Sequence, residues 1–363
     1  MAGESLSVEV VQEMEGETAG QLRVTIRDVA TLAGVSISTV SHTFSGRRSI
    51  SEATRERVLS AAAKLGYAAD PSARTLRTGR SGLLGMILRP RDAAHGSHGG
   101  TETFTRFSGT VATEVIDHKL GLVHVPDIFD PAASRVAMDG CIVAFPYGSD
   151  PVLAELRRRK LPLVVADADP DIPDFAWSVR LDHAAAMRNL LDRLAGQGAG
   201  RIWFLSGTED NAWNRYSREA YLSWSRNRGM APCALSLYEG EGRQGACALL
   251  TPLLEGRDRP DAVVAAASRF AAGVADSADA AGMRIPDDLM VAALTDSAFV
   301  REHKPPITAV DLVLEEVGQL AVELLLARLE GAPEPEVPVT LPPVLHWRES
   351  TMRVGEDSAG RIG

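Results

Sequence analysis

Residues 24–46 predict two short helices joined by a tight turn, and this segment constrains the chain more than any other. Thr25 and Asp28 can form a capping box at the start of the first helix, whose apolar residues recur with helical spacing. Gly34 stands at the turn, where a residue without a Cβ atom adopts a left-handed conformation at low cost. Ser36 is the expected N-cap of the second helix. We therefore expect a helix-turn-helix, whose second helix enters the major groove of DNA.

The second helix, residues 37–44, should turn small polar side chains outward. We expect Val35 and Val40 in a small core, and we expect five residues to point away from it: Ser36, Ile37, Ser38, Ser41 and His42. A third helix is predicted over residues 51–65. Ser51 is its expected N-cap, and four residues form its expected apolar stripe: Val58, Leu59, Ala62 and Leu65.

Charge is distributed unevenly along the chain. The whole sequence has a net charge of −10, which by itself points away from nucleic acid. Between Arg23 and Arg80, however, ten basic residues face four acidic ones, so this segment carries a net charge of +6. Local positive charge next to DNA phosphates releases counterions, which makes binding strong and dependent on salt. The distribution of charge therefore supports a DNA-binding N-terminal part and an acidic remainder.

Six short fragments occur in one order over residues 25–76. They are Thr25-Ile26 with Asp28-Val29-Ala30, Ala33-Gly34-Val35-Ser36, Thr39-Val40-Ser41, Thr54-Arg55 with Val58, Gly66-Tyr67, and Ala73-Arg74 with Leu76. In these fragments the chain resembles the lactose/galactose repressor (LacI/GalR) family of bacterial transcription regulators. The resemblance implies a sequence-specific DNA-binding regulator, most simply a ligand-responsive repressor of catabolic or transport genes.

The resemblance also implies which residues contact DNA. Three residues would face base edges: Ile37, Ser38 and His42. Six would position the backbone through phosphates: Thr25, Ser36, Thr39, Ser41, Thr54 and Tyr67. The expected DNA-binding set also includes Ile26, Ser45, Ala73 and Leu76. Most family members have arginine where this chain has His42, so the preferred base at that position is open.

Residues 71–81 correspond to the family's hinge, which folds into a helix on the operator. Leu76 fits the apolar wedge that enters the minor groove and bends the duplex. The alternative for Leu76 is a linker side chain packed on the following domain. A two-fold homodimer would place two recognition helices on a near-palindromic operator.

From residue 82 onward, short apolar runs alternate with amphipathic helices, the pattern of parallel sheets covered on both faces. Strands are predicted over residues 83–88, 120–125, 140–145, 163–166, 201–205, 262–265 and 289–294, with helices over residues 104–119, 150–159 and 183–194. Residues 82–350 also resemble the family's effector and dimerisation domain, which is two-lobed and similar to a periplasmic sugar-binding protein. The expected fold class is thus α/β, preceded by a three-helix helix-turn-helix domain (residues 23–70) and a hinge helix.

Two positions depart from the sugar-binding members of the family. Those members usually have carboxylates at the positions of Ser268 and Thr295, and Thr295 lies beside Asp296. A hydroxyl binds a pair of sugar hydroxyls less well than a carboxylate does. We therefore expect an effector other than an ordinary neutral hexose; the alternative is a sugar held by other groups, such as Asp296 and Trp213. A regulator without a small effector is a further variant.

The family's ligand-binding arginine corresponds here to Arg215 or Arg218. The expected effector-binding set is Trp213, Arg215, Arg218, Ser268, Thr295 and Asp296. Trp213 and Arg215 could instead be a packed tryptophan and a surface arginine.

Other chemistry has little support in the sequence. We find no Walker loop, no Gly-x-Ser-x-Gly and no His-Glu-x-x-His, so we expect no enzyme and no cofactor. Asp167, Asp169, Asp171 and Asp174 alternate with prolines and are expected in a surface loop. His95 and His98 lack further ligands, so no metal is expected. Three cysteines in no spaced motif fit a reducing, cytoplasmic environment.

The two ends of the chain are expected to be loose. Residues 1–22 carry five glutamates and no basic residue, which predicts a disordered acidic tail or a misassigned start codon; they do not form a signal peptide. Residues 351–363 are expected to be a flexible tail. No run is long and apolar enough to span a membrane. The alternative for the whole chain is a solute-binding or enzymatic α/β protein without a specific DNA role. Effector identity, the sign of its effect and the operator sequence stay open.

Overall fold

The computed structural model describes residues 24–45, 48–67, 80–89, 102–125, 128–130 and 136–353. The chain divides into two compact units between Gly79 and Arg80, and each is described here by itself. Among the described residues, no helix combines the length and the apolar character needed to cross a membrane.

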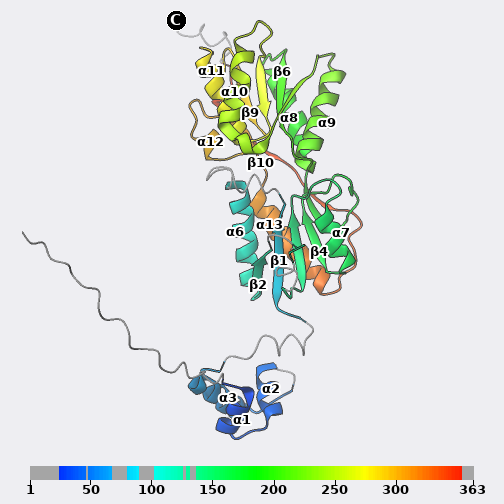
Figure 1. The fold of residues 1–363 in the computed structure, drawn as a ribbon, viewed down its shortest axis with the longest axis vertical. Coiled ribbons are helices and arrows are strands. Elements are labelled where there is room, and N and C mark those ends of the chain that lie inside the picture. Colours follow the sequence, from blue (N-terminus) through cyan, green and yellow to red (C-terminus); the bar gives the residue numbers. More distant parts are fainter. Residues whose placement is uncertain are drawn as a thin grey trace, which may run out of the picture. The chain divides into compact units, whose positions relative to one another are not determined.

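The N-terminal unit consists of α1 (Ile26–Ala33), α2 (Ile37–Ser45) and α3 (Glu52–Leu65) (Figure 1). The capping box predicted for α1 is present: the Asp28 carboxylate accepts hydrogen bonds from the Thr25 backbone N–H and hydroxyl, both at 2.8 Å. Gly34 has a φ of 63°, which confirms the predicted left-handed turn. Ser36 and Ser51 cap the next two helices by accepting from N–H groups three residues on.

The core of this unit is small. Its seven buried side chains are Val29, Ala30, Ala33, Val40, Val58, Ala61 and Ala62. The prediction for the apolar stripe of α3 was wrong at one position, because Leu59 is 42% exposed and Ala61 is buried. With 3.6 residues per turn, Val58, Ala61 and Ala62 share one face of α3, and Leu59 lies off it.

The C-terminal unit has two lobes, each built on a six-stranded sheet, which confirms the predicted α/β class. The first sheet has the order β11-β5-β4-β3-β1-β2, and all its paired strands run parallel. Its strands are β1 (Leu83–Leu88), β2 (Gly121–His124), β3 (Gly140–Ala144), β4 (Leu163–Ala166), β5 (Ser178–Leu181) and β11 (Val339–Leu341).

The second sheet has the order β12-β10-β9-β8-β6-β7, and only its β10–β12 pair is antiparallel. Its strands are β6 (Ile202–Gly207), β7 (Cys233–Leu237), β8 (Ala262–Ala265), β9 (Met290–Ala293), β10 (Thr308–Asp311) and β12 (Val344–His346). Parallel pairing places the carboxyl ends of the central strands of each sheet at one edge.

Helices cover both faces of each sheet (Figure 1). The first lobe has α6 (Glu102–Asp117), α7 (Pro151–Arg158) and α13 (Leu314–Leu329). The second has α8 (His183–Gly196), α9 (Ala212–Asn227), α10 (Gly242–Leu254), α11 (Ser268–Ala280) and α12 (Ala298–Arg301), with two 3-10 turns at Glu239–Glu241 and Glu349–Thr351. The chain passes between the lobes after β5, after β10 and after β11, so the space between them is bordered by residues from distant parts of the sequence.

Candidate DNA-binding surface and effector cleft

The start of α2 carries an exposed group of hydroxyls. Ser36 Oγ lies 2.7 Å from Ser38 Oγ and 2.8 Å from Thr39 Oγ1, and it accepts from the Thr39 N–H at 3.1 Å. Ile37 is 46% exposed beside them. Ser36, which caps α2, therefore also contacts the hydroxyls of Ser38 and Thr39 in the first turn of this helix.

The remaining residues predicted to contact DNA are less uniformly placed. Thr25 is exposed, whereas Ser41, His42, Thr54 and Tyr67 are half-buried. Ile26 packs against the small core. Ala73 and Leu76 lie outside the described residues, as does the Ser45 side chain.

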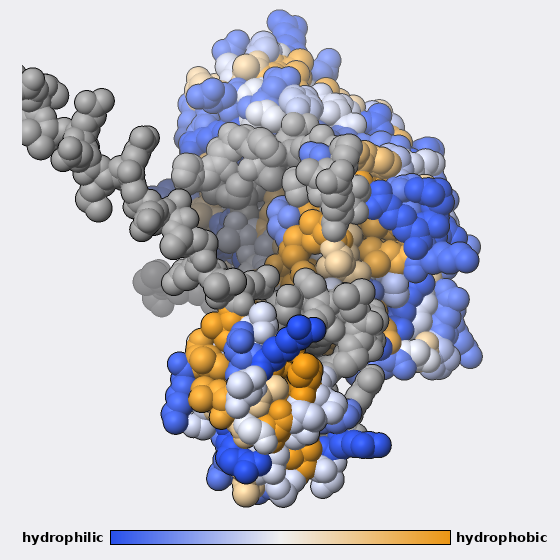
Figure 2. Space-filling model, turned by 60° about the horizontal axis from the view of Figure 1, so that its bottom comes forward, coloured by the Kyte–Doolittle hydropathy of each residue, from blue (hydrophilic) through white to orange (hydrophobic). Residues whose placement is uncertain are grey.

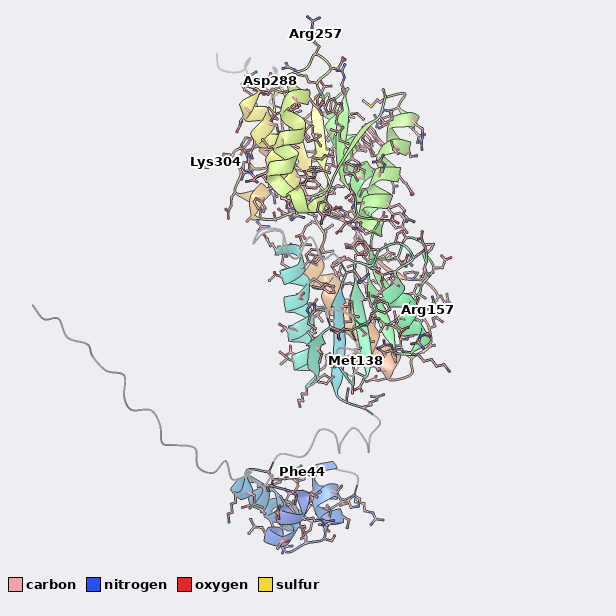
Figure 3. All side chains as sticks on the ribbon, viewed as in Figure 1. Phe44, Met138, Arg157, Arg257, Asp288 and Lys304 are labelled. Carbon is pink, nitrogen blue, oxygen red and sulfur yellow. The ribbon has the colours of Figure 1, made fainter. Side chains whose placement is uncertain are left out.

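Apolar side chains also reach the surface of the N-terminal unit. The space-filling view shows them among hydrophilic ones (Figure 2), and they are Leu32, Ile37, Phe44 and Leu59. Phe44, labelled in Figure 3, contacts the ring of Tyr67 with centroids 5.8 Å apart.

A cavity lies between the two lobes of the C-terminal unit, with about 780 Å³ of empty space, part of it open to solvent. Part of its lining, including Phe145, Asp167 and Leu312, directly follows strands, and open α/β sheets bind ligands at such strand ends. The first lobe contributes Thr103, Phe104, Phe145, Asp167 and Leu181. The remaining lining residues are His183, Glu209, Asn211, Trp213, Glu239, Ala267, Ser268, Arg269, Thr295 and Leu312.

Three of the six predicted effector residues line this cavity: Trp213, Ser268 and Thr295. The Thr295 and Ser268 hydroxyls are already engaged, since Thr295 Oγ1 accepts from the Ser268 N–H at 2.8 Å and Ser268 Oγ accepts from Ser297 Oγ at 2.7 Å. The Trp213 indole N–H is buried and has no hydrogen-bond partner in the described part of the chain.

The other three predicted effector residues are held elsewhere. Arg215 bonds to Asp210 of its own lobe at 2.7 Å and to Asp171 of the first lobe. Arg218 donates to the Ser236 hydroxyl at 3.2 Å. Asp296 is buried and accepts from Arg348 at 2.7 Å.

The expectation of a surface loop after β4 was wrong for two of its four aspartates. Asp167 and Asp169 are each 3% exposed. Asp169 is buried because its carboxylate accepts three backbone N–H groups, from Ser149, Asp150 and Asp171, at 2.9–3.1 Å. These bonds order the loop that the prolines interrupt.

Asp167 has a different environment. Its Oδ2 lies 2.9 Å from His183 Nε2, whereas its Oδ1 is buried and accepts no hydrogen bond from any described residue. The residue directly follows β4 and has a φ of 73°. Its position at the carboxyl end of a predicted strand was the signal that could have indicated a cleft residue.

Arg269 and Glu239 were also missed by sequence reasoning. Glu239 is buried and accepts from the Glu209 N–H, the Asn214 amide and the Thr208 hydroxyl at 2.8–3.2 Å. Arg269 is 6% exposed, and its burial lowers the pKa of its guanidinium despite the opposing charges of Glu239 and Glu209. Arg269 directly follows Ser268, so the sequence placed it next to the predicted site without indicating its burial.

Contacts across the cleft join the lobes on two sides. On one side, Tyr147 Oη lies 3.2 Å from Glu209 Oε1, and the Gly148 N–H donates to the Asp210 carbonyl at 2.7 Å. On the other side, Glu102 accepts from the Ala298 N–H at 2.9 Å and from Arg301. The lobes are therefore closed over the cavity.

Within the described part of the chain, no cluster of three or more His, Cys, Asp or Glu side chains is arranged to hold a metal ion. His95 and His98 lie outside the described residues. Burial raises the pKa of the Cys141 thiol to about 12, so this side chain stays protonated and unreactive at neutral pH.

Comparison with known proteins agrees with both units. Residues 25–70 match the family of bacterial regulatory proteins, lacI family, and residues 191–351 match a periplasmic binding protein-like domain. The HTH-type transcriptional repressor PurR of Photobacterium profundum is 26% identical over 319 residues, which cover 84% of this chain and 92% of the relative. The HTH-type transcriptional regulator CelR of Thermobifida fusca is 26% identical over 336 residues, which cover 90% and 98%.

Solved structures show the same fold. A lac repressor dimer bound to operator and the anti-inducer ONPF aligns with a TM-score of 0.78 at 22% identity, covering 91% of this chain and 99% of that one. A CelR–cellobiose complex aligns with a TM-score of 0.67 at 23% identity, covering 90% and 100%. The chain thus combines a DNA-binding domain of the lacI family with a periplasmic binding protein-like domain, and it is a DNA-binding transcription regulator with a ligand-binding domain.

Proposed function

We propose that this regulator is a ligand-responsive repressor that binds a near-palindromic operator as a homodimer in the cytoplasm, where the chromosome lies. The observation that carries the proposal is the exposed, capped start of α2 in a chain whose second unit encloses a cavity between two lobes. Two copies of the helix on a two-fold dimer match two half-sites. Genes for catabolism or transport are the expected targets, because a small-molecule effector then reports the nutrient.

In this proposal, α2 reads the major groove. Ile37 and Ser38 are exposed at its first turn, and in this proposal they meet base edges. The hydroxyls of Thr25, Ser36, Thr39, Ser41 and Thr54, with Tyr67, would set the register through phosphates. His42 would read one further base pair with a single hydrogen bond, where an arginine would make two.

The effector would act by changing how tightly the lobes close. Tyr147–Glu209 and Glu102–Arg301 join the lobes from opposite sides of the cavity, so a ligand that contacts both lobes favours closure. If residues 71–81 fold on the operator, closure and operator binding are coupled through this hinge. The coupling is reciprocal: whatever factor the effector imposes on operator affinity, the operator imposes on effector affinity.

We propose no catalytic activity. The curated relatives are named as transcription regulators, and the polar groups of the cavity are arranged as hydrogen-bond donors and acceptors around an enclosed space. A ligand held there is bound and released unchanged.

The test is selection of bound sequences from a random DNA pool by the purified full-length chain, followed by a salt titration on the best site. A near-palindrome with a flexible central step is the expected result, and its affinity should fall steeply with salt. Binding that depends on salt but enriches no sequence, with or without an extract of small metabolites, would contradict a sequence-specific repressor.

A further inference from the structure

The cavity between the lobes is lined by a cationic side chain, Arg269, that has no hydrogen-bonding partner among the described residues. Arg269 begins α11, is 6% exposed and lines the cavity. None of the described residues accepts a hydrogen bond from its guanidinium, and Glu239 and Glu209 act on it only through their charge. Glu239 already accepts three other donors. A guanidinium has five N–H donors in a planar fork, and a carboxylate in the cavity would accept from two of them at once.

Two more groups in the same cavity lack partners. The Trp213 indole N–H, on α9, is a second unmet donor in the lobe of Arg269. Asp167 Oδ1, at the end of β4, is an unmet acceptor in the opposite lobe. The cavity thus offers donors on one side and an acceptor on the other. A ligand that satisfies all three groups must carry an acceptor-rich end and a donor end.

The space between these groups has apolar walls. Phe104 and Phe145 contact each other edge to face, with ring centroids 5.6 Å apart, and Leu181 and Leu312 line the same cavity. Such walls favour an aliphatic or aromatic body over a ring that presents hydroxyls on all sides.

The charge of the cavity sets the charge of the ligand. Arg269 is already partly balanced by the nearby carboxylates of Glu239 and Glu209. These carboxylates would repel a phosphate with two negative charges more strongly than a single carboxylate. The planar fork of a guanidinium also matches a carboxylate through two parallel hydrogen bonds.

We propose that the effector is a small monocarboxylate with an apolar body and an amino or hydroxyl group. Its carboxylate binds Arg269 and the Trp213 indole, and its amino or hydroxyl group donates to Asp167. The proposal rests on the proposed function, in which this cavity is the effector site.

The test measures binding of named probes to the full-length protein by calorimetry. The probes are apolar and aromatic α-amino acids, the corresponding α-hydroxy acids, the amide of each, neutral hexoses and disaccharides, and hexose phosphates. We expect at least one amino or hydroxy acid to bind, and its amide to bind at least about 30-fold more weakly. The two acid series distinguish an amino from a hydroxyl donor.

Variants assign the groups. Arg269→Gln should abolish the preference for acid over amide, and Asp167→Asn should weaken the acid and the amide alike. Arg284→Gln is the matched control, because Arg284 is an exposed arginine paired with Asp288 at the far end of the second lobe (Figure 3). It should leave all affinities unchanged.

The melting temperature without ligand tests separately the premise that Arg269 is available to a ligand. If Arg269 awaits a ligand, Arg269→Met should leave the melting temperature unchanged or raise it, because an unpartnered buried charge is removed. A clear fall would show that Arg269 neutralises Glu239 and Glu209, and would overturn the proposal. The proposal would also be overturned if a hexose or hexose phosphate bound more tightly than the acids, or if none of the acids bound. An acid that binds Arg269→Gln as tightly as the unsubstituted protein would overturn it as well. Operator selection is independent of these results, so the repressor assignment can stand if the effector class fails.

Discussion

Replacing Val58 by alanine should destabilise the N-terminal unit strongly, whereas replacing the adjacent and larger Leu59 should not. Val58 is fully buried and is one of three side chains larger than alanine among the seven buried core residues. Losing two methyl groups costs roughly 0.8 kcal/mol each, and the cavity left behind raises the total to about 2 kcal/mol.

Leu59→Ala provides the matched control. Leu59 follows Val58 in α3 but is 42% exposed, so water fills the space that its side chain leaves. The expected loss is less than about 1 kcal/mol, because no cavity forms. Helix propensity favours alanine at both positions and cannot produce the contrast.

Hydrogen exchange on the full-length protein measures the difference. Exchange from α1, α2 and α3 should accelerate about 30-fold in Val58→Ala and less than about 5-fold in Leu59→Ala, since about 1.4 kcal/mol is a factor of ten. Strands β4 and β8 report on the other unit and should not change. Operator DNA should restore protection in Val58→Ala, because it binds only the folded unit. Equal acceleration in both variants, or a larger effect at Leu59, would refute this account of the core.

Three further predictions concern recognition and closure. His42→Arg should change the preferred base at one position of each half-site, which sequence selection would detect; an unchanged motif would remove His42 from the recognition surface. Leu76→Ala should weaken operator binding much more than random-DNA binding in competition assays, and equal losses would contradict a minor-groove wedge. Burial by itself would raise the pKa of Glu102, but its bonds to Arg301 and the Ala298 N–H outweigh this and lower it. The stabilisation is therefore present at neutral pH and lost as pH falls through the depressed pKa. Glu102→Gln should lower the melting temperature at pH 7, and this difference should disappear once the pH falls below the depressed pKa of Glu102; a difference that persists in strong acid would exclude this ion pair as its cause.

Sequence alone was enough to predict the elements whose signals lie within a few residues. The caps at Thr25, Ser36 and Ser51 each involve a residue three positions away, and the turn at Gly34 needs only its own backbone. Apolar runs likewise predicted β1, β4 and β8 with their observed bounds, because strands buried on both faces are apolar throughout. Strands β5, β7, β10, β11 and β12 escaped prediction, because they are short and lie at or next to sheet edges, where polar residues interrupt the pattern.

The side chains of the cleft that are available to a ligand could be identified only from the three-dimensional fold. Arg215 was predicted to bind an effector but is held by Asp171, 44 positions earlier in the chain and in the other lobe. Asp167 was expected at the surface but is buried beside His183. Arg269 gave no signal beyond its position, because its burial depends on elements that precede it by tens of residues. Local periodicity reports which residues share a helix or strand, whereas the state of a buried charge depends on every group that the fold brings near it.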